Sequence, residues 1–399
     1  MSHQIVTAAH QHYLHRTNSD FLLMNFTQPY LSRGLPAIFL TFLVGVALYG
    51  CAPTVKVVDR VPVRALVYPA PPDEPRFVFE RTLYGSADVV PEEKESALRR
   101  ALTGGVLNSE GLGKPYAVAV YRGRVLVSDS ADRFVTVFDI PRGKHYKIGA
   151  DEGEGGLVKP LGLDIDASGT VYVADVTAKI IRVYDIDGKF LRNIAGPKFF
   201  DRLSSVSVTP DGSRLYVVDI GGVSSDLHRV RVFDAVNGDH LFDIGKRGTG
   251  PGEFNLPRDV AVGKDGRIYV VDGGNFRVQI FDRDGKYMSS FGTVGKQLGN
   301  FARPKEIATD KDGNVYVADS AFGNFQIFTP DGDLLMFIGE RSEQDGPGKY
   351  MLPSGITVGD DGRVYFVDQW FRKVDVFRPY ALKADEGELV YKLKPAGKP

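Results

Sequence analysis

The chain has 399 residues, and its 49 lysines and arginines nearly balance 50 aspartates and glutamates, so the formal net charge is −1. This balance argues against a dedicated nucleic-acid binder, which would carry a basic footprint. The 45 glycines and 18 tyrosines are typical of a turn-rich β protein, because glycine adopts the positive φ that tight turns need. The single cysteine, Cys51, excludes a disulfide within the chain.

An apolar run without charged residues occupies positions 35–50 and ends directly before Cys51. It is shorter than the roughly twenty apolar residues of a membrane-spanning helix and fits the hydrophobic core of a signal peptide. Residues 48–51, LYGC, resemble a bacterial lipobox, in which the cysteine is lipidated and becomes the new N-terminus. The alternative is a short signal-anchor helix with an incidental cysteine. The position of the sole cysteine at the end of the run favours lipidation.

These features predict four segments along the chain. Residues 1–50 form a signal peptide behind an N-terminal extension that processing removes, and 51–75 form the lipidated cysteine with a proline-rich tether. A globular body follows at 76–382, and 383–399 form a C-terminal tail or outer strand. The expected location is the bacterial cell envelope, lipid-anchored, on the periplasmic or outer-membrane side.

One sequence motif recurs along the globular body and ends each time in an aspartate, with spacings of 44 to 53 residues between successive copies. An apolar strand, an Asp-Gly turn and a tyrosine-rich strand such as RIYVVD lead up to the aspartate, and a loop and two further strands follow it. Asp-Gly between alternating strands is the strongest local hairpin signal, and the spacing fits the blades of a β-propeller. The aspartates are Asp129, Asp175, Asp219, Asp272, Asp319 and Asp368.

Two of the copies resemble a known repeat. Residues 248–282, GTGPGEFNLPRDVAVGKDGRIYVVDGGNFRVQIFD, resemble an NHL repeat almost from end to end, and residues 299–328 match nearly as well. The resemblance covers residues 114–380. It implies an all-β fold, a six-bladed NHL-like β-propeller of four-stranded antiparallel blades, of the bacterial lipoprotein type. Radial stacking of the blades buries the faces that one blade alone would leave exposed.

Closing such a ring requires the two chain ends to meet. Residues 76–85, RFVFERTLYG, resemble the outer strands, and we predict that they complete the sixth blade. Residues 388–394, ELVYKLK, are the competing candidate. Between them, residues 91–102 predict a short amphipathic helix with acidic residues early and arginines late, as the helix dipole favours.

The six repeated aspartates are expected to cap turns rather than to bind a cation, since each belongs to its own turn. The Asp-x-Asp-Gly turns lack the remaining ligands of a calcium loop. The body's histidines, His145, His228 and His240, occupy different blade positions and so do not converge on a zinc site. We therefore assign no catalytic residue, no metal and no cofactor.

The residues that begin the innermost strands face the central channel of a propeller. In blades four and five these are Arg258, Asp259, Lys305 and Glu306, which lie side by side at one channel mouth in this interpretation. We predict a polar pocket there for a small ion or a peptide group. Salt bridges between the blades are the alternative role.

The loops between second and third strands carry aromatic and basic residues, which are favoured anchors at protein interfaces. We predict a docking face there, with ordinary packing as the alternative; stacking on RNA is disfavoured outside the cytoplasm. The residues are Arg133, Phe134, Phe276, Arg277, Phe322, Trp370, Phe371 and Arg372.

The sequence therefore favours a membrane-anchored, extracytoplasmic propeller that serves as a protein-interaction or ligand-binding scaffold. The body contains no P-loop, nucleotide fingerprint or Ser-His-Asp set, so a non-catalytic role is favoured. The alternative is a lyase or hydrolase with a metal or ligand site at the channel mouth. The expected partners are another envelope or membrane-associated protein and, through the lipid, the membrane, but no nucleic acid. We expect the propeller to be monomeric.

Overall fold

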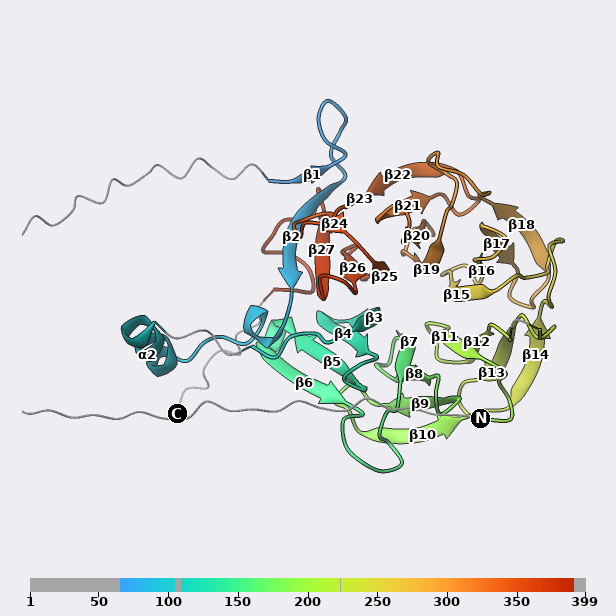
Figure 1. The fold of residues 1–399 in the computed structure, drawn as a ribbon, viewed down its shortest axis with the longest axis horizontal. Coiled ribbons are helices and arrows are strands. Elements are labelled where there is room, and N and C mark those ends of the chain that lie inside the picture. The colour runs from blue at the N-terminus through green and yellow to red at the C-terminus, as the bar shows by residue number, and fades with distance from the viewer. Residues whose placement is uncertain (1–64, 105–108, 223, 391–399) are drawn as a thin grey trace, which may run out of the picture. The chain divides into compact units, whose positions relative to one another are not determined.

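The computed structural model describes residues 65–104, 109–222 and 224–390. They form six antiparallel sheets arranged as blades around a central axis (Figure 1), which confirms the predicted all-β, six-bladed propeller. The innermost strands contact each other around the whole ring. These strands are β3 (Pro115–Tyr121), β7 (Pro160–Ile165), β11 (Leu203–Val208), β15 (Pro257–Val262), β19 (Pro304–Thr309) and β25 (Pro353–Val358).

Three further strands complete each blade in radial order. The second strands are β4 (Arg124–Asp129), β8 (Val171–Asp175), β12 (Arg214–Asp219), β16 (Ile268–Asp272), β20 (Val315–Asp319) and β26 (Val364–Asp368). The third strands are β5 (Phe134–Asp139), β9 (Ile180–Tyr184), β13 (Arg229–Asp234), β17 (Arg277–Phe281), β21 (Asn324–Phe328) and β27 (Lys373–Pro379). The outer strands are β6 (Lys144–Ile148), β10 (Phe190–Ile194), β14 (His240–Ile244), β18 (Tyr287–Phe291), β22 (Leu334–Ile338) and β2 (Phe77–Leu83).

The Asp-Gly sequences form the hairpin turns within the blades. Between β19 and β20, an oxygen of the Asp310 carboxylate accepts hydrogen bonds from the backbone N–H groups of Asp312 (2.9 Å) and Asn314 (2.8 Å). Gly313 has φ +86°, a left-handed conformation that an L side chain rarely adopts. The Asp282 carboxylate holds the turn between β17 and β18 in the same way. These acidic turns therefore shape the blades.

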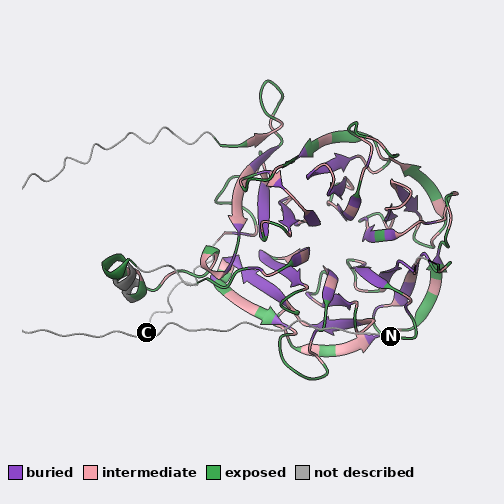
Figure 2. Cartoon of the chain, viewed as in Figure 1, coloured by how far each residue is buried: buried purple, intermediate pink, exposed green. Residues whose placement is uncertain are grey.

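Apolar side chains pack between neighbouring blades. One such layer joins Tyr269 and Val271 of β16 to Val315 and Val317 of β20, and all four are at most 1% exposed. Figure 2 shows the consequence for the whole ring: the inner and middle strands are buried, whereas the outer strands are largely half-buried or exposed. Blade stacking, rather than any single sheet, buries the core.

The N-terminal strand β2 closes the ring as the outer strand of the sixth blade, as the sequence predicted, and pairs antiparallel with β27. The buried guanidinium of Arg363, directly before β26, binds both carboxylate oxygens of Glu80 on β2, at 2.6 and 3.2 Å. Strand β1 (Val67–Tyr68) adds a fifth strand beyond β2. The sheet thus extends on the N-terminal side of the boundary predicted at residue 76, because the proline-rich segment turns back onto β2.

The remaining elements lie outside the four-stranded pattern. The helix α2 (Lys94–Thr103) falls within the predicted helical segment apart from its last residue. The 3-10 turn η1 (Ser86–Asp88) precedes blade one in sequence, and η2 (Ile140–Arg142) connects β5 and β6 within it. Strands β23 (Glu340–Arg341) and β24 (Lys349–Tyr350) form a short parallel pair before β25.

The end of the described chain packs against the sixth and first blades without joining a sheet. Leu389 is 6% exposed within the apolar cluster between these blades, and the Glu388 N–H donates to Asp361 at 2.9 Å. In the described ranges, no helix combines the length and apolar character needed to cross a membrane. The predicted signal segment, Cys51 and most of the tether lie outside those ranges.

Candidate functional site

The propeller has two ends, and strand register assigns residues to each. The first residue of each innermost strand pairs with the aspartate that ends the second strand, as in Pro115 with Asp129 and Pro304 with Asp319. Strand starts and the loops after the second strands therefore share one end, which we call the loop face. The hairpin turns between innermost and second strands form the opposite end, the turn face.

The six repeated aspartates hold the loop face together. Each is fully buried, and its carboxylate accepts backbone N–H groups just before its own innermost strand. Asp319, for example, binds the N–H groups of Ala302 (2.7 Å) and Arg303 (3.0 Å), and those of Ala321 and Phe322 in the following loop. Asp129 and Asp368 make the same kinds of contact on both sides. The predicted capping role is found, and these carboxylates clamp the preceding segment as well.

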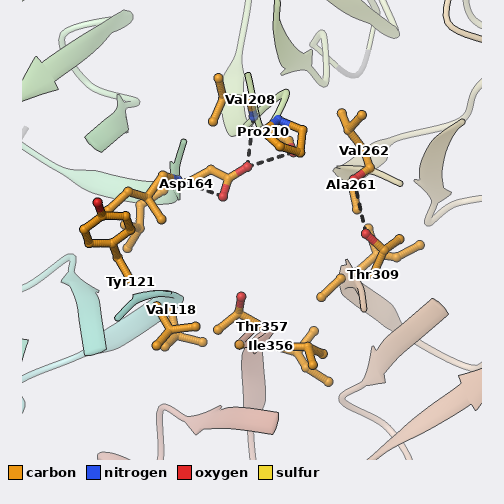
Figure 3. A pocket seen from close by; sticks show the side chains of 18 of the residues that line it. Val118, Tyr121, Asp164, Val208, Pro210, Ala261, Val262, Thr309, Ile356 and Thr357 are labelled. Atoms are coloured by element: carbon orange, nitrogen blue, oxygen red, sulfur yellow. Dashed lines mark hydrogen bonds between the residues drawn. The ribbon is translucent and has the colours of Figure 1, made fainter. Parts of the chain in front are cut away.

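A central cavity of about 530 Å³ is lined by all six innermost strands. Figure 3 shows the ring of side chains around it, including Val118, Asp164, Val208, Val262, Thr309 and Ile356. The lining extends to exposed residues of the turn face, such as Lys264, Lys311 and Asp360, and reaches Asp259 and Glu306 in the interior. The strand starts Arg258 and Lys305 are not part of the lining. The cavity is therefore open toward the turn face.

Two of the predicted channel residues, Asp259 and Glu306, are 6% exposed and lie on neighbouring innermost strands at the inner end of this cavity. The Asp259 carboxylate accepts the Ser205 hydroxyl (2.5 Å) from β11 and the Ile307 N–H (2.8 Å) from β19, so it links three blades. One carboxyl oxygen of Glu306, Oε1, is buried without a hydrogen-bond partner in the described part of the protein.

Arg258 and Lys305 point to the other side of the same two strands. Within the described ranges, no salt bridge joins either cation to Asp259 or Glu306, so the predicted alternative of inter-blade salt bridges is wrong. Hydrogen bonds from the neighbouring strand take the place of the ion pairs. The four residues predicted at one channel mouth therefore occupy two places. Arg258 and Lys305 lie on the loop face, and Asp259 and Glu306 line the cavity.

Burial raises the pKa of three of the carboxyls that line the cavity interior, those of Asp259, Glu306 and Asp164. The pKa of Asp259 rises to about 7, although hydrogen bonds from Ser205 and Ile307 act against the rise. The pKa of Glu306 is raised well above its usual range by burial and by the nearby Asp259 carboxylate. The pKa of Asp164 rises to about 6 for the same primary reason. Burial also lowers the pKa of Lys305 to about 8. The cavity thus contains carboxyls that a cationic ligand would help to ionise.

The predicted docking residues divide into two groups. Arg277 binds Asp272 at 2.9 Å and two backbone carbonyls, which is a structural role. Phe276 packs against an apolar cluster between blades four and five. Trp370 is different: its side chain is 62% exposed in the loop after β26. Half-buried aromatic residues, namely Phe134, Phe322 and Phe371, and the exposed cations Arg133 and Arg372 complete the set.

Sequence reasoning missed a ring of cations on the loop face. Four of them stand directly before innermost strands, at equivalent positions in their blades: Lys114, Lys159, Arg202 and Arg303. Together with Arg133, Arg372, Arg258 and Lys305 they form what we call the cation ring. No member is in a salt bridge among the residues that the structure describes. Aligning the blades at the position before each leading proline would have revealed three of these cations, and Arg202 stands at the same position before Leu203.

Three acidic side chains of the loop face are engaged with groups other than the cation ring. Asp201 accepts the Gly222 N–H at 2.9 Å, Glu253 lies 3.4 Å from Lys246, and Asp345 pairs with Lys373 at 3.0 Å. The hydrogen bonds and the nearby cations lower the pKa of each of these carboxylates. The positive charge of the cation ring is therefore not neutralised by these neighbours.

In the described ranges, no three histidine, cysteine, aspartate or glutamate side chains form a group that could hold a metal ion. His228 is 1% exposed and lies on the loop face. Its Nδ1 atom accepts a hydrogen bond from the Leu256 N–H at 3.1 Å. His240 bonds within its own blade, to Asp243 at 2.6 Å, whereas His228 links the loop of blade three to the start of blade four.

Comparison with known proteins agrees with this architecture. A sequence model of the NHL repeat matches residues 254–281. Human NHL repeat-containing protein 3 is 34% identical over 97 residues, which are 24% of this chain and 26% of that protein. Protein lin-41 of Caenorhabditis elegans is 40% identical over 65 residues, 16% of this chain and 6% of that protein. The matches thus span about a quarter, or less, of these relatives.

Solved structures share the fold at low sequence identity. A protein of unknown function from Bacteroides thetaiotaomicron superposes with a TM-score of 0.56 at 18% identity, over 75% of each chain. A gluconolactonase from Xanthomonas campestris has a TM-score of 0.50 at 17% identity, over 67% of this chain and 86% of that one. These likenesses concern the fold alone. The chain is a six-bladed β-propeller that carries an NHL repeat.

Proposed function

We propose that this propeller is a protein-interaction scaffold, held outside the cytoplasm by a lipid on Cys51, whose loop face binds an acidic region of another envelope protein. The NHL repeat and the propeller fold support a scaffold role. The observation that carries the choice of partner is the cation ring, whose side chains surround the axis without ion-pair partners among the described residues.

An exposed aromatic residue supplies the apolar anchor. Trp370 lies in the same loop as Arg372, and aromatic and arginine side chains dominate the binding energy of protein interfaces. Further large apolar side chains are exposed in loops of this face, including Phe199 (40%), Val294 (64%) and Leu298 (49%). Clustered cations attract an acidic partner at long range, and their effect weakens as salt screens the charges.

The docking test uses the full-length chain to isolate partners from native envelope extracts. Replacing Arg303 and Lys114 by glutamate should reduce recovery of an acidic protein, and Trp370→Ala should reduce it independently. The matched control replaces Lys264 and Lys311 on the turn face by glutamate, which should leave recovery unchanged. Equal losses in both charge-reversed variants, or recovery of RNA in place of an acidic protein, would contradict the proposal.

The anchoring part of the proposal has a separate test. Cells that produce the wild-type chain or Cys51→Ala are labelled with a radioactive fatty acid, and the chain is isolated from membrane and soluble fractions. We expect label and membrane association in the wild type and loss of both in the variant. Equal labelling of the two chains would remove the lipid anchor without affecting the docking face.

A further inference from the structure

The central cavity is independent of the docking face, because it opens at the opposite end of the propeller. From the turn face, the lining begins with polar and charged residues such as Lys264, Lys311 and Asp360. Below them lies a largely aliphatic collar at equivalent positions of the six innermost strands: Val120, Ile165, Val208, Val262, Thr309 and Val358. Further in, a second aliphatic layer is buried in the apolar clusters between the blades and exposes little surface to the cavity: Val118, Leu163, Val206, Val260, Ile307 and Ile356. The collar is thus an apolar band in an otherwise polar lining, and it gives the hydrocarbon portion of a ligand an apolar contact.

The innermost layer breaks the symmetry of the ring. At the next equivalent position, blades four and five carry Asp259 and Glu306, whereas blades one, two and six carry Ala117, Gly162 and Gly355. The carboxyls are therefore concentrated on one side. Asp164, from the layer between the two aliphatic ones, adds a third carboxyl that lines the cavity.

The unpaired oxygen of Glu306 is the feature that requires explanation. The side chain is 6% exposed and lines the cavity, and its Oε1 atom has no hydrogen-bond partner among the described residues. The neighbouring Asp259 differs, since both of its oxygens accept hydrogen bonds. An unsatisfied buried polar atom destabilises the folded chain, and native proteins retain few of them. A donor from a bound ligand would remove this destabilisation.

The charge around Glu306 indicates which kind of hydrogen-bond donor a ligand would bring to its Oε1 atom. Asp259 stands beside Glu306 and Asp164 lies near Asp259, so a positive ligand group would be attracted by several carboxyls. Lys305, the adjacent cation of the chain, forms no salt bridge with Glu306 and does not line the cavity. Tyr116 and Arg258 also lie near these carboxyls from the side of the loop face.

We propose that the cavity binds a small organic cation with an aliphatic portion, of the alkylammonium class, whose N–H group donates a hydrogen bond to Glu306 Oε1. The ligand enters from the turn face. Its hydrocarbon portion lies within the aliphatic collar, and its cationic group reaches Glu306 and Asp259.

Isothermal titration of the full-length chain with three probes of equal length tests this proposal: hexylammonium, 1-hexanol and hexanoate. We expect hexylammonium to bind and the neutral and anionic probes to bind at least about tenfold more weakly, since a charge-assisted hydrogen bond is the stronger kind. Absence of hexylammonium binding, or equal binding of the three probes, would overturn the proposal. This comparison requires no variant.

A pair of near-isosteric variants then locates the cationic group. Glu306→Gln should weaken hexylammonium binding about 10- to 100-fold, as expected for loss of a hydrogen bond to a charged group. Glu343→Gln makes the same change at an exposed glutamate that does not line the cavity, and it should leave the affinity within about twofold. Thermal unfolding confirms that both variants fold. Unchanged affinity in Glu306→Gln, or an equal loss in Glu343→Gln, would refute the assignment.

Discussion

Two sets of buried carboxylates differ in where their hydrogen bonds come from. The strand-end aspartates, such as Asp319 and Asp368, recur in every blade and bind backbone N–H groups of their own blade. The cavity carboxyls do not recur: Asp259 bonds to the two neighbouring blades, and Glu306 keeps an oxygen without a partner among the described residues. The comparison teaches that the repeated carboxylates fix the loops of their own blades, whereas the unrepeated Asp259 links neighbouring blades and Glu306 keeps an oxygen that a further donor can reach.

The largest effect is expected from removing a repeated carboxylate. Asp319→Ala leaves several buried N–H groups of the loop face without an acceptor and should lower the free energy of unfolding by about 3–5 kcal/mol. Urea denaturation followed by circular dichroism measures the change. The control, Asp284→Ala, removes an exposed carboxylate and should change stability by less than about 0.5 kcal/mol. Similar losses in the two variants would show that the repeated aspartates contribute no more to stability than an exposed carboxylate does.

Ring closure should give the next largest effect. Glu80→Ala leaves the Arg363 guanidinium, which is 0% exposed, paired only with the Asp361 carboxylate and the Glu386 carbonyl. Breaking a buried pair on one side costs about 2–4 kcal/mol in stability. Thermal unfolding of Glu80→Ala can be compared with that of Asp331→Ala, which breaks the more exposed pair with Arg267. If β2 does not close the ring, the two variants will unfold at the same temperature.

The unrepeated carboxyls should make the free energy of unfolding depend on pH. Folding raises the pKa of Asp259 from an ordinary 3.8 to about 7, so between these values the folded chain keeps a proton that the unfolded chain releases. The free energy of unfolding should therefore fall as pH rises from 4 to 7, by at most about 1.4 kcal/mol per pH unit from this group. Glu306 and Asp164, whose pKa values are also raised, act in the same direction.

Asp259→Asn separates this contribution from the others. The variant should show a shallower decline in stability between pH 4 and pH 7, measured by urea denaturation at several pH values. Asp331→Asn, whose carboxylate is exposed, serves as the control and should follow the wild type. A decline in Asp259→Asn as steep as in the wild type would show that Asp259 is ionised in the folded chain throughout this range.

The smallest effect on stability is expected on the loop face. Trp370 is 62% exposed, so Trp370→Ala should change the free energy of unfolding by less than about 0.5 kcal/mol while it weakens partner binding. The buried Phe377 of the same blade provides the contrast, since Phe377→Ala should cost about 3–5 kcal/mol. Comparable destabilisation by both variants would mean that Trp370 belongs to the core.

Features that repeat could be predicted from the sequence, because each copy confirms the others. The blade number, the hairpin turns at Asp310 and Asp282, and closure by residues 76–85 follow from matching one blade to the next. Strand alternation places Arg258 and Asp259 on opposite sides, but which of the two lines the cavity could not be predicted, because a register shift between Pro257 and Val260 interrupts the alternation. The unpaired oxygen of Glu306 depends on side-chain packing, which spacing does not reveal.

The central claim, that repeated carboxylates stabilise the ring and an unrepeated one binds a ligand, is tested most directly by one paired measurement on Asp319→Asn and Glu306→Gln. Each variant is assayed for its thermal unfolding midpoint and for its affinity for hexylammonium. The account predicts opposite outcomes: Asp319→Asn loses stability and keeps the wild-type affinity while folded, and Glu306→Gln keeps its stability and loses affinity. A variant pair in which stability and affinity fall together, or in which neither changes, would contradict it.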